Sequence, residues 1–207
     1  MIEYREKYKA VTVSNTEDMA RELLEEEALT GLFSIEQISR KSSYKVKSHA
    51  TIMHDMTTNR IEEHLALDMV RSAKEYDLIG KMLDFQVPIK NIRKDCGVGK
   101  IDIIAYNGSD VTLLELKAKN SSETLLRCVL EIFTYWKQLD HQKFLYDFGL
   151  SQENIVKKAV LVFVDSVAYR QYENKEKYPN THELMEKLGV ELFLLGETDG
   201  SYTVSKP

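Results

Sequence analysis

One short stretch near the middle of the chain limits the possible folds most strongly. Residues 102–117 read DIIAYNGSDVTLLELK, and the pair Asn107-Gly108 is a strong signal for the turn of a β-hairpin. The segments on either side of this turn are apolar almost throughout, which is typical of strands that are buried on both faces. The sequence also places three charged residues at the strand ends far from the turn: Asp102, Glu115 and Lys117.

The elements expected around this hairpin alternate between helix and strand. Apolar spacing and end signals predict helices over 15–29, 58–76, 122–139 and 181–188, a short helix over 35–41, strands over 43–53, 85–89, 158–164 and 190–195, and a peripheral hairpin or tail from residue 196. This order predicts an α/β fold, a three-layer sandwich with a central mixed β-sheet flanked by helices. Within the sheet we expect an antiparallel meander first and then a crossover to parallel pairing.

The chain length of 207 residues allows one domain with a sizeable core and a small appended segment. There are only three prolines, and no linker rich in proline or glycine divides the sequence. We expect residues 1–57 to form an N-terminal extension of helix and strand, packed on a core domain of residues 58–207.

Composition points to a protein of the cytoplasm that does not enter a membrane. No apolar run approaches the ~18–20 residues of a membrane span. The N-terminus, MIEYREKYKA, lacks the apolar segment of a secretory signal. The two cysteines, Cys96 and Cys128, form no CxxC motif, which argues against a disulfide framework or a structural zinc site.

The charge distribution is uneven. The net charge of −5 is not typical of a nucleic-acid-binding protein, whose usual footprint is basic. Between Arg40 and Arg60, however, five basic residues stand against one acidic residue, Asp55. Such a strip could dock a phosphate backbone, because surface charges act over about 8–10 Å. It could equally be a solvated strand edge, which lysines commonly decorate.

The hairpin turn decides where Asp102 lies. Side chains alternate along a strand, so Glu115 and Lys117 share one face. With a four-residue loop starting at Asn107, Asp102 lies directly opposite Glu115. With a two-residue loop, Asp102 is a diagonal neighbour of Glu115 on the same face. A three-residue loop would separate the two carboxylates, unless a bulge intervened.

Two neighbouring carboxylates at the end of a buried sheet are unfavourable, because proximity and desolvation both raise their pKa values. Lys117 could neutralise one charge. A divalent cation that prefers oxygen ligands, Mg²⁺ or Mn²⁺, could neutralise the rest, with the backbone carbonyl of Leu116 as a further ligand. The alternative is a structural ion cluster in which Asp102, Glu115 and Lys117 neutralise one another.

At these residues the chain resembles the PD-(D/E)xK nuclease superfamily, which has the restriction-endonuclease-like fold. Asp102 matches the first acidic position of the family, and Glu115-Leu116-Lys117 matches its (D/E)xK unit. The family order of helix, three strands, helix and strand matches about residues 58–164, although Ile101 stands where many members have a proline. Many relatives carry Gln and Tyr on the following helix, where this chain has Glu131 and Tyr135.

The resemblance implies a metal-dependent nuclease, with DNA favoured over RNA as its substrate. Asp102, Glu115 and the Leu116 carbonyl would hold one or two Mg²⁺ or Mn²⁺ ions, and Lys117 would orient the attacking water. The preceding helix of the family often adds a carboxylate. Glu62 is aligned with the apolar stripe of its helix, so we expect it, rather than Glu63, to point at the site and to complete the set of metal ligands. The alternative is an ordinary exposed glutamate.

A set of basic residues is expected to contact nucleic acid: Arg40, Lys41, Lys45, Lys47, Lys100, Lys119 and Arg127. For Arg127 the sequence favours a plain surface ion pair with Glu131, four residues later on the same helix. Many related nucleases act as dimers, so a homodimer is a candidate assembly. The competing function is a non-catalytic nucleic-acid-binding or assembly module that retains the nuclease fold.

Overall fold

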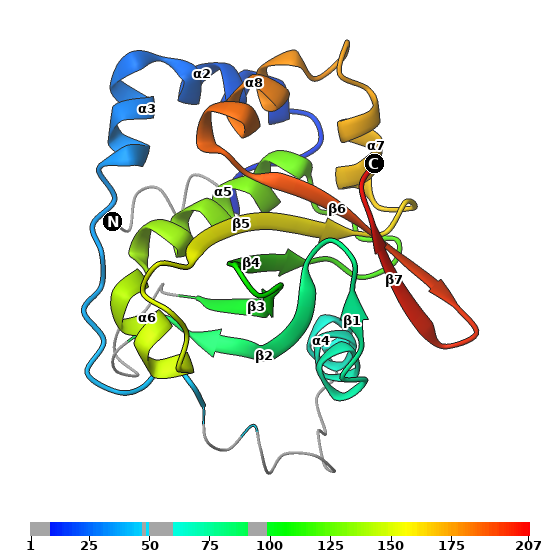
Figure 1. Cartoon of the computed structure of the whole chain (residues 1–207). Helices are drawn as coiled ribbons and strands as arrows, with labels where there is room; N and C mark the ends of the chain where they lie inside the picture. The colour runs from blue at the N-terminus through cyan, green and yellow to red at the C-terminus, as the bar shows by residue number, and fades with distance from the viewer. Residues whose placement is uncertain (1–8, 47–48, 50–59, 91–98) are drawn as a thin grey trace.

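The computed structural model describes residues 9–46, 49, 60–90 and 99–207 of the chain, and these residues form seven helices and seven strands (Figure 1). The helices are α2 (Thr16–Leu24), α3 (Glu26–Phe33), α4 (Ile61–Arg71), α5 (Leu125–Gln138), α6 (His141–Phe148), α7 (Val167–Glu173) and α8 (Pro179–Leu188). The strands are β1 (Glu75–Tyr76), β2 (Gly80–Pro88), β3 (Lys100–Tyr106), β4 (Asp110–Leu116), β5 (Ile155–Val162), β6 (Glu191–Thr198) and β7 (Ser201–Ser205).

All seven strands belong to one sheet whose spatial order follows the sequence, from β1 to β7. Strands β1 to β4 form an antiparallel meander, β4, β5 and β6 pair in parallel, and β7 returns antiparallel to β6. The predictions of a mixed sheet, of a meander before the parallel crossover and of the α/β class are confirmed. So is the C-terminal hairpin, which β6 and β7 form.

The sheet has an apolar layer on each face, and in Figure 1 it passes between α5 and α4. On one face, α2, α3, α5, α6 and α8 share a single core with the strands. On the other face, Leu65 and Met69 of α4 pack with Ile103 and Leu114 of the hairpin. The largely apolar sequences of β4 and β5 are explained by this arrangement, because most of their side chains are buried on either face.

The N-terminal helices are tied to the core through α8. Glu17 of α2 accepts hydrogen bonds from the backbone N–H and the side chain of both Asn180 and Thr181, at 2.5–3.0 Å. These N–H groups lie in the first turn of α8, where the helix itself offers them no acceptor and where the helix dipole favours a negative charge. A single carboxylate therefore caps α8 and fixes α2 against it.

Several predicted elements were wrong in the N-terminal half. The predicted helix over 15–29 is two helices, because Glu25 adopts an extended ψ of 139° between α2 and α3. Residues 35–41 are not helical. Instead the Ile38 N–H donates to the Gln138 carbonyl and the Gln37 amide donates to the Leu139 carbonyl. These contacts with the end of α5 replace the local hydrogen bonds of a helix.

The other differences concern element ends. Residues 43–46 form no strand, and most of the predicted strand over 43–53 lies outside the described residues. The helix expected over 58–76 ends at Arg71, since Ala73 takes a left-handed φ of 49° and residues 75–76 turn back as β1. Strand β2 begins five residues earlier than the predicted strand over 85–89. Helices α6 and α7 were not predicted.

Candidate active site

The hairpin adopts the four-residue loop. Tyr106 pairs with Val111 and Ile103 pairs with Leu114, so Asp102 lies opposite Glu115, one position beyond the last pair. Its carboxylate takes the place of a strand partner: Oδ2 accepts the Leu116 N–H at 3.0 Å, and Oδ1 accepts the Gln86 side-chain amide at 2.8 Å. Asp102 therefore lies between β2 and β4, at the end of the sheet far from the turn.

Gln86 has a strained backbone conformation. Its φ is 47°, in the left-handed region that non-glycine residues seldom occupy, and it does so within β2 directly beside Asp102. Such a conformation costs on the order of 1–3 kcal/mol, and strain of this kind is concentrated at functional sites. Gln86 is a site residue that no pattern in the sequence indicated.

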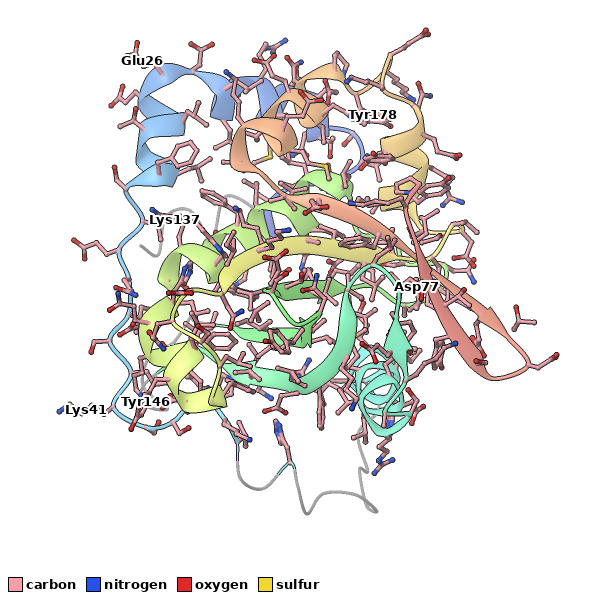
Figure 2. The ribbon with its side chains drawn as sticks, viewed as in Figure 1. Glu26, Lys41, Asp77, Lys137, Tyr146 and Tyr178 are labelled. Carbon is pink, nitrogen blue, oxygen red and sulfur yellow. The ribbon has the colours of Figure 1, made fainter. Side chains whose placement is uncertain are left out.

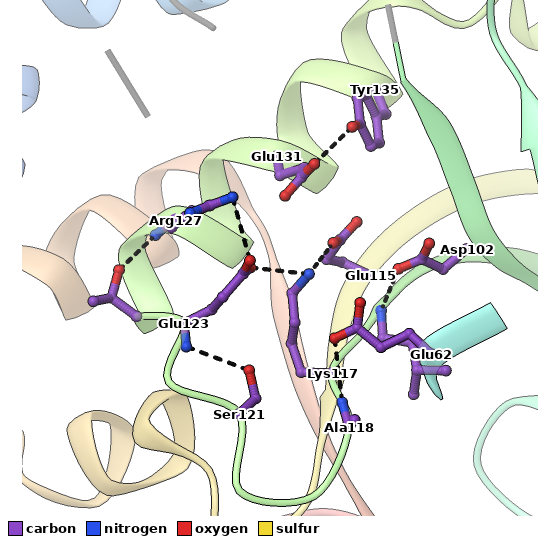
Figure 3. A network of polar contacts seen from close by, with 12 residues as sticks. Glu62, Asp102, Glu115, Lys117, Ala118, Ser121, Glu123, Arg127, Glu131 and Tyr135 are labelled. Atoms are coloured by element: carbon purple, nitrogen blue, oxygen red, sulfur yellow. Dashed lines mark hydrogen bonds and ion pairs between the residues drawn. The ribbon is translucent and has the colours of Figure 1, made fainter. Parts of the chain in front are cut away.

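Glu115 and Lys117 form a buried ion pair on the α5 side of the sheet. Their exposed fractions are 3% and 4%, and Lys117 Nζ donates to Glu115 Oε1 at 2.6 Å (Figure 3). Glu123 Oε2 lies on the other side of the ammonium group at 3.0 Å. The second oxygen of Glu115, Oε2, is buried and has no hydrogen-bond partner among the described residues. A buried carboxylate oxygen without a partner is costly unless a ligand satisfies it.

Helix α5 adds a further carboxyl group. The Tyr135 hydroxyl donates to Glu131 Oε1 at 2.7 Å, and Glu131 is near enough to act electrostatically on both Asp102 and Glu115. Tyr135 can reach this position because residue 99 is glycine, since a Cβ there would lie 2.0–2.7 Å from the Tyr135 ring and hydroxyl. Gly99 therefore lets α5 approach the start of β3.

Of the two neighbouring glutamates on α4, Glu62 is the one directed at the hairpin. Its Oε1 lies 3.4 Å from the Ala118 N–H, just after Lys117, and its charge acts on Asp102. Glu63 instead pairs with Arg60 at 2.8 Å.

A surface pocket of about 550 Å³ opens onto this cluster. It is lined by the start of α4, by Gln86 and Asp102, and by the segment between β4 and α5, including Glu123. Glu115 and Lys117 lie behind this wall and do not line the pocket. Four of the lining residues are acidic, Glu62, Glu63, Asp102 and Glu123, and only Arg60 is basic. The pocket would therefore repel a polyanion unless a cation entered with it.

The metal ligands expected from the sequence are only partly brought together. Among the described residues, no group of three Asp, Glu, His or Cys side chains is arranged so that it could hold a metal ion. Mg²⁺, however, is usually bound by only one or two carboxylates together with waters and substrate phosphates. Asp102 at the pocket and the unpartnered Oε2 of Glu115 fit that simpler ligand set, whereas Glu62 bonds the backbone.

Burial perturbs the ionisation of all three central groups. Burial raises the pKa of Asp102 to about 7, with smaller contributions from Glu131 and Glu62, while Lys117 and the Leu116 N–H oppose the rise. Burial, and then Asp102 and Glu131, raise the pKa of Glu115 well above its usual range. Burial opposes the charge of Lys117, but Glu115, Cys128, Asp102 and Glu131 together outweigh it, so the pKa of Lys117 is raised well above its ordinary value. Burial therefore favours the neutral forms of Asp102 and Glu115, whereas the groups around Lys117 favour its charged form.

The basic residues expected to contact nucleic acid do not form one strip in the described part of the chain. Arg40, Lys41 and Lys45 lie on an irregular loop rather than a strand edge. The loop is joined to α6 by a hydrogen bond from the Tyr44 N–H to Asp147, and Figure 2 shows Lys41 near Tyr146. Arg40 donates to the Lys90 carbonyl just beyond β2. Lys47 lies outside the described residues.

The remaining basic residues lie nearer the carboxyl cluster. Lys100 is exposed at the start of β3, two residues before Asp102. Lys119 is exposed just after Lys117 and pairs with Glu197 at 2.8 Å. The expected pair between Arg127 and Glu131 is wrong. Arg127 pairs with Glu123 at 3.2 Å, because the loop before α5 brings Glu123 alongside while Glu131 bonds Tyr135.

Across the described ranges, every helix is too short or too polar to cross a membrane. Comparison with protein-family models, curated proteins and solved structures gives no match to this chain.

Proposed function

We propose that the chain is a metal-dependent nuclease of the PD-(D/E)xK type that hydrolyses phosphodiester bonds in nucleic acid, with DNA favoured over RNA. The observation that carries the proposal is the convergence of Asp102, Glu115 and Lys117 at one end of a buried hairpin. There a buried Glu115 oxygen has no partner among the described residues and Asp102 opens onto a pocket.

The order of elements around the site supports a restriction-endonuclease-like fold. Apart from the two-residue strand β1 and helix α6, the elements α4, β2–β3–β4, α5 and β5 follow one another as helix, three strands, helix and strand. Helices α4 and α5 pack on opposite faces of the hairpin. This arrangement brings Glu62 from α4 and Glu131 from α5 toward the end of the hairpin that carries Asp102 and Glu115.

The residues that would hold a cation are Asp102 and Glu115, with the Leu116 carbonyl beside them. When bound, Mg²⁺ or Mn²⁺ would supply a water of lowered pKa and would neutralise charge that develops on the phosphoryl oxygens. Asp102 is held by Gln86 and by the Leu116 N–H, so its carboxylate is oriented before any ligand arrives. Such preorganisation is worth most in a site from which water is largely excluded.

Lys117 would act on the substrate through its charge and its N–H donors. Its ammonium group stays protonated because carboxylates surround it. A charged donor fixed within a buried site can orient the attacking water or bind a phosphoryl oxygen that becomes more negative during the reaction. In this proposal Glu62 positions the backbone after Lys117 through the Ala118 N–H and adds negative charge at the pocket.

The experiment is a cleavage assay on the full chain with single-stranded DNA, double-stranded DNA and RNA, in Mg²⁺, in Mn²⁺ and in EDTA. We expect metal-dependent cleavage that Asp102→Asn abolishes and that Lys117→Met reduces to a small residual rate, while circular dichroism shows that both variants remain folded. Glu183→Gln removes a charge from the exposed pair of Glu183 with Lys187 and is the matched control. Equal cleavage by wild type and both site variants would exclude this site.

A non-catalytic nucleic-acid-binding module is the second candidate. It is favoured by one observation, the lack of a three-ligand metal group among the described residues. Calorimetric titration with Mn²⁺ separates the two: heat of binding that Asp102→Asn removes supports the nuclease, whereas nucleic-acid binding without any metal binding supports the module.

A further inference from the structure

Glu123 lies in the connection between β4 and α5, because the helix expected from residue 122 begins only at Leu125. Its Oε2 is 3.0 Å from Lys117 Nζ and its Oε1 is 3.2 Å from the Arg127 guanidinium (Figure 3). Lys117 therefore has two carboxylate partners that come from different parts of the fold. Glu115 is on β4 itself, and Glu123 is on the connection to α5.

The connection that carries Glu123 is held by several independent hydrogen bonds. The Glu123 N–H donates to Ser121 Oγ at 3.3 Å, and Thr124 caps α5 by accepting the Arg127 N–H at 3.3 Å. On the side of α7, the Leu125 N–H donates to Gln171 at 2.8 Å. The Val167 N–H donates to the Ser121 carbonyl at 2.9 Å, and the Asn120 N–H donates to Asp165 at 3.1 Å. The Glu123 carboxylate is thus positioned by a scaffold that does not depend on β4.

The two partners of Lys117 differ in what else they do. Glu115 belongs to the proposed cation site, and a cation there would compete with Lys117 for the same negative charge. Glu123 is not in that ligand set, and its other oxygen is already occupied by Arg127. Among the described residues Glu123 is the other carboxylate in an ion pair with Lys117, so it can keep the ammonium group in place when Glu115 is engaged elsewhere.

We propose that Glu123 is a positioning residue for Lys117: it holds the lysine ammonium at the site while Glu115 binds the metal. The effect on catalysis rests on the proposed nuclease function, but the holding of Lys117 does not. The role differs from that of a plain surface pair, because Glu123 acts through Lys117 rather than by fastening the loop to Arg127.

The first test observes the lysine directly, by nitrogen-15 NMR of lysine ammonium groups in the full chain. Burial and two carboxylate partners slow the exchange of the Lys117 ammonium hydrogens with water, so we expect the Lys117 signal to be visible with and without Mg²⁺. The signal is assigned to Lys117 by its absence from the spectrum of Lys117→Arg. In Glu123→Gln we expect the signal to broaden or disappear when Mg²⁺ is added. In the control Glu183→Gln it should persist. A Lys117 signal unchanged by Glu123→Gln in both conditions overturns the proposal.

The second test is a double-mutant cycle on single-turnover cleavage at saturating metal and substrate. Losing a contact to a charged group should lower the single-turnover rate of Glu123→Gln by about tenfold to hundredfold. In the Lys117→Met background, Glu123→Gln should cause no further loss. An additional tenfold loss in that background overturns the proposal. A wild-type chain that cleaves nothing refutes the nuclease proposal instead, and the NMR result then decides the role of Glu123 alone.

Discussion

Replacing Asp102 with Asn should change how stability depends on pH in the metal-free protein. Burial raises the pKa of Asp102 from 3.8 to about 7 in the folded chain, so the folded state binds its proton more tightly than the unfolded state does. The stabilisation is complete below pH 3.8 and is lost as the pH rises through about 7. Stability of the wild type should therefore fall between pH 5 and pH 8.

The size of this effect follows from the same pKa. A rise from 3.8 to about 7 corresponds to an upper bound of about 4 kcal/mol. Asp102 lines the pocket and is only half-buried by its exposed surface, so contact with water reduces the figure. The window from pH 5 to pH 8 covers only about two of the roughly three pH units of this shift, so we expect the free energy of unfolding of wild type to fall by roughly 1–3 kcal/mol relative to Asp102→Asn.

The assay is urea denaturation in EDTA at pH 5, 6, 7 and 8, with wild type, Asp102→Asn and the control Glu183→Gln. The amide introduced by Asp102→Asn keeps an oxygen that can accept the Leu116 N–H, so the comparison isolates the titrating proton. Curves of stability against pH that run parallel for wild type and Asp102→Asn would refute the assignment of a raised pKa to this carboxyl group.

Three further predictions concern the metal, the substrate and the fold. Mg²⁺ binding should release protons, and its affinity should increase as the pH rises from 6 to 8, because Asp102 and Glu115 have raised pKa values. Calorimetry in buffers of different ionisation enthalpy measures the number of protons released and the affinity. Fluorescence anisotropy should show nucleic-acid binding with Ca²⁺ and far weaker binding in EDTA, because the pocket is acidic, and equal binding in both would contradict its role. Glu17→Ala should lower the free energy of unfolding by about 2–4 kcal/mol without altering metal binding, because it removes the carboxylate that caps α8.

The parts of the fold that the sequence predicted are those fixed by local chemistry. The turn at Asn107, the largely apolar strand β4 and the amphipathic helix α5 each carry their own signal in the sequence, so the order of these elements and the mixed sheet could be predicted. The register remained open because Asn-Gly also suits a two-residue loop. In the structure the hairpin has a four-residue loop, in which Asn107 Oδ1 accepts hydrogen bonds from the N–H groups of Ser109 and Asp110 at 3.1 and 2.8 Å.

Long-range contacts explain what the sequence could not show. The irregular path of residues 35–41 is set by backbone acceptors at the end of α5, about a hundred positions later in the chain. Glu123 fell in the first turn of the helix predicted over 122–139, and nothing indicated its partner Lys117, which it reaches only after the connection folds back over β4. Gln86 carried no signal because its unusual φ and its bond to Asp102 both arise from the pairing of β2 with β3.

The charges around Lys117 favour a cation site over a structural ion cluster. A cluster that only neutralised itself would match its positive and negative groups and leave no buried oxygen without a partner. Here Asp102, Glu115, Glu123 and Glu131 act on Lys117 or contact it, and Arg127 is the other cation of the network. The excess of carboxyl groups, the unpartnered Glu115 oxygen and the strained Gln86 coincide at one sheet end. A divalent cation would satisfy the first two at once, whereas a purely structural role accounts for none of the three.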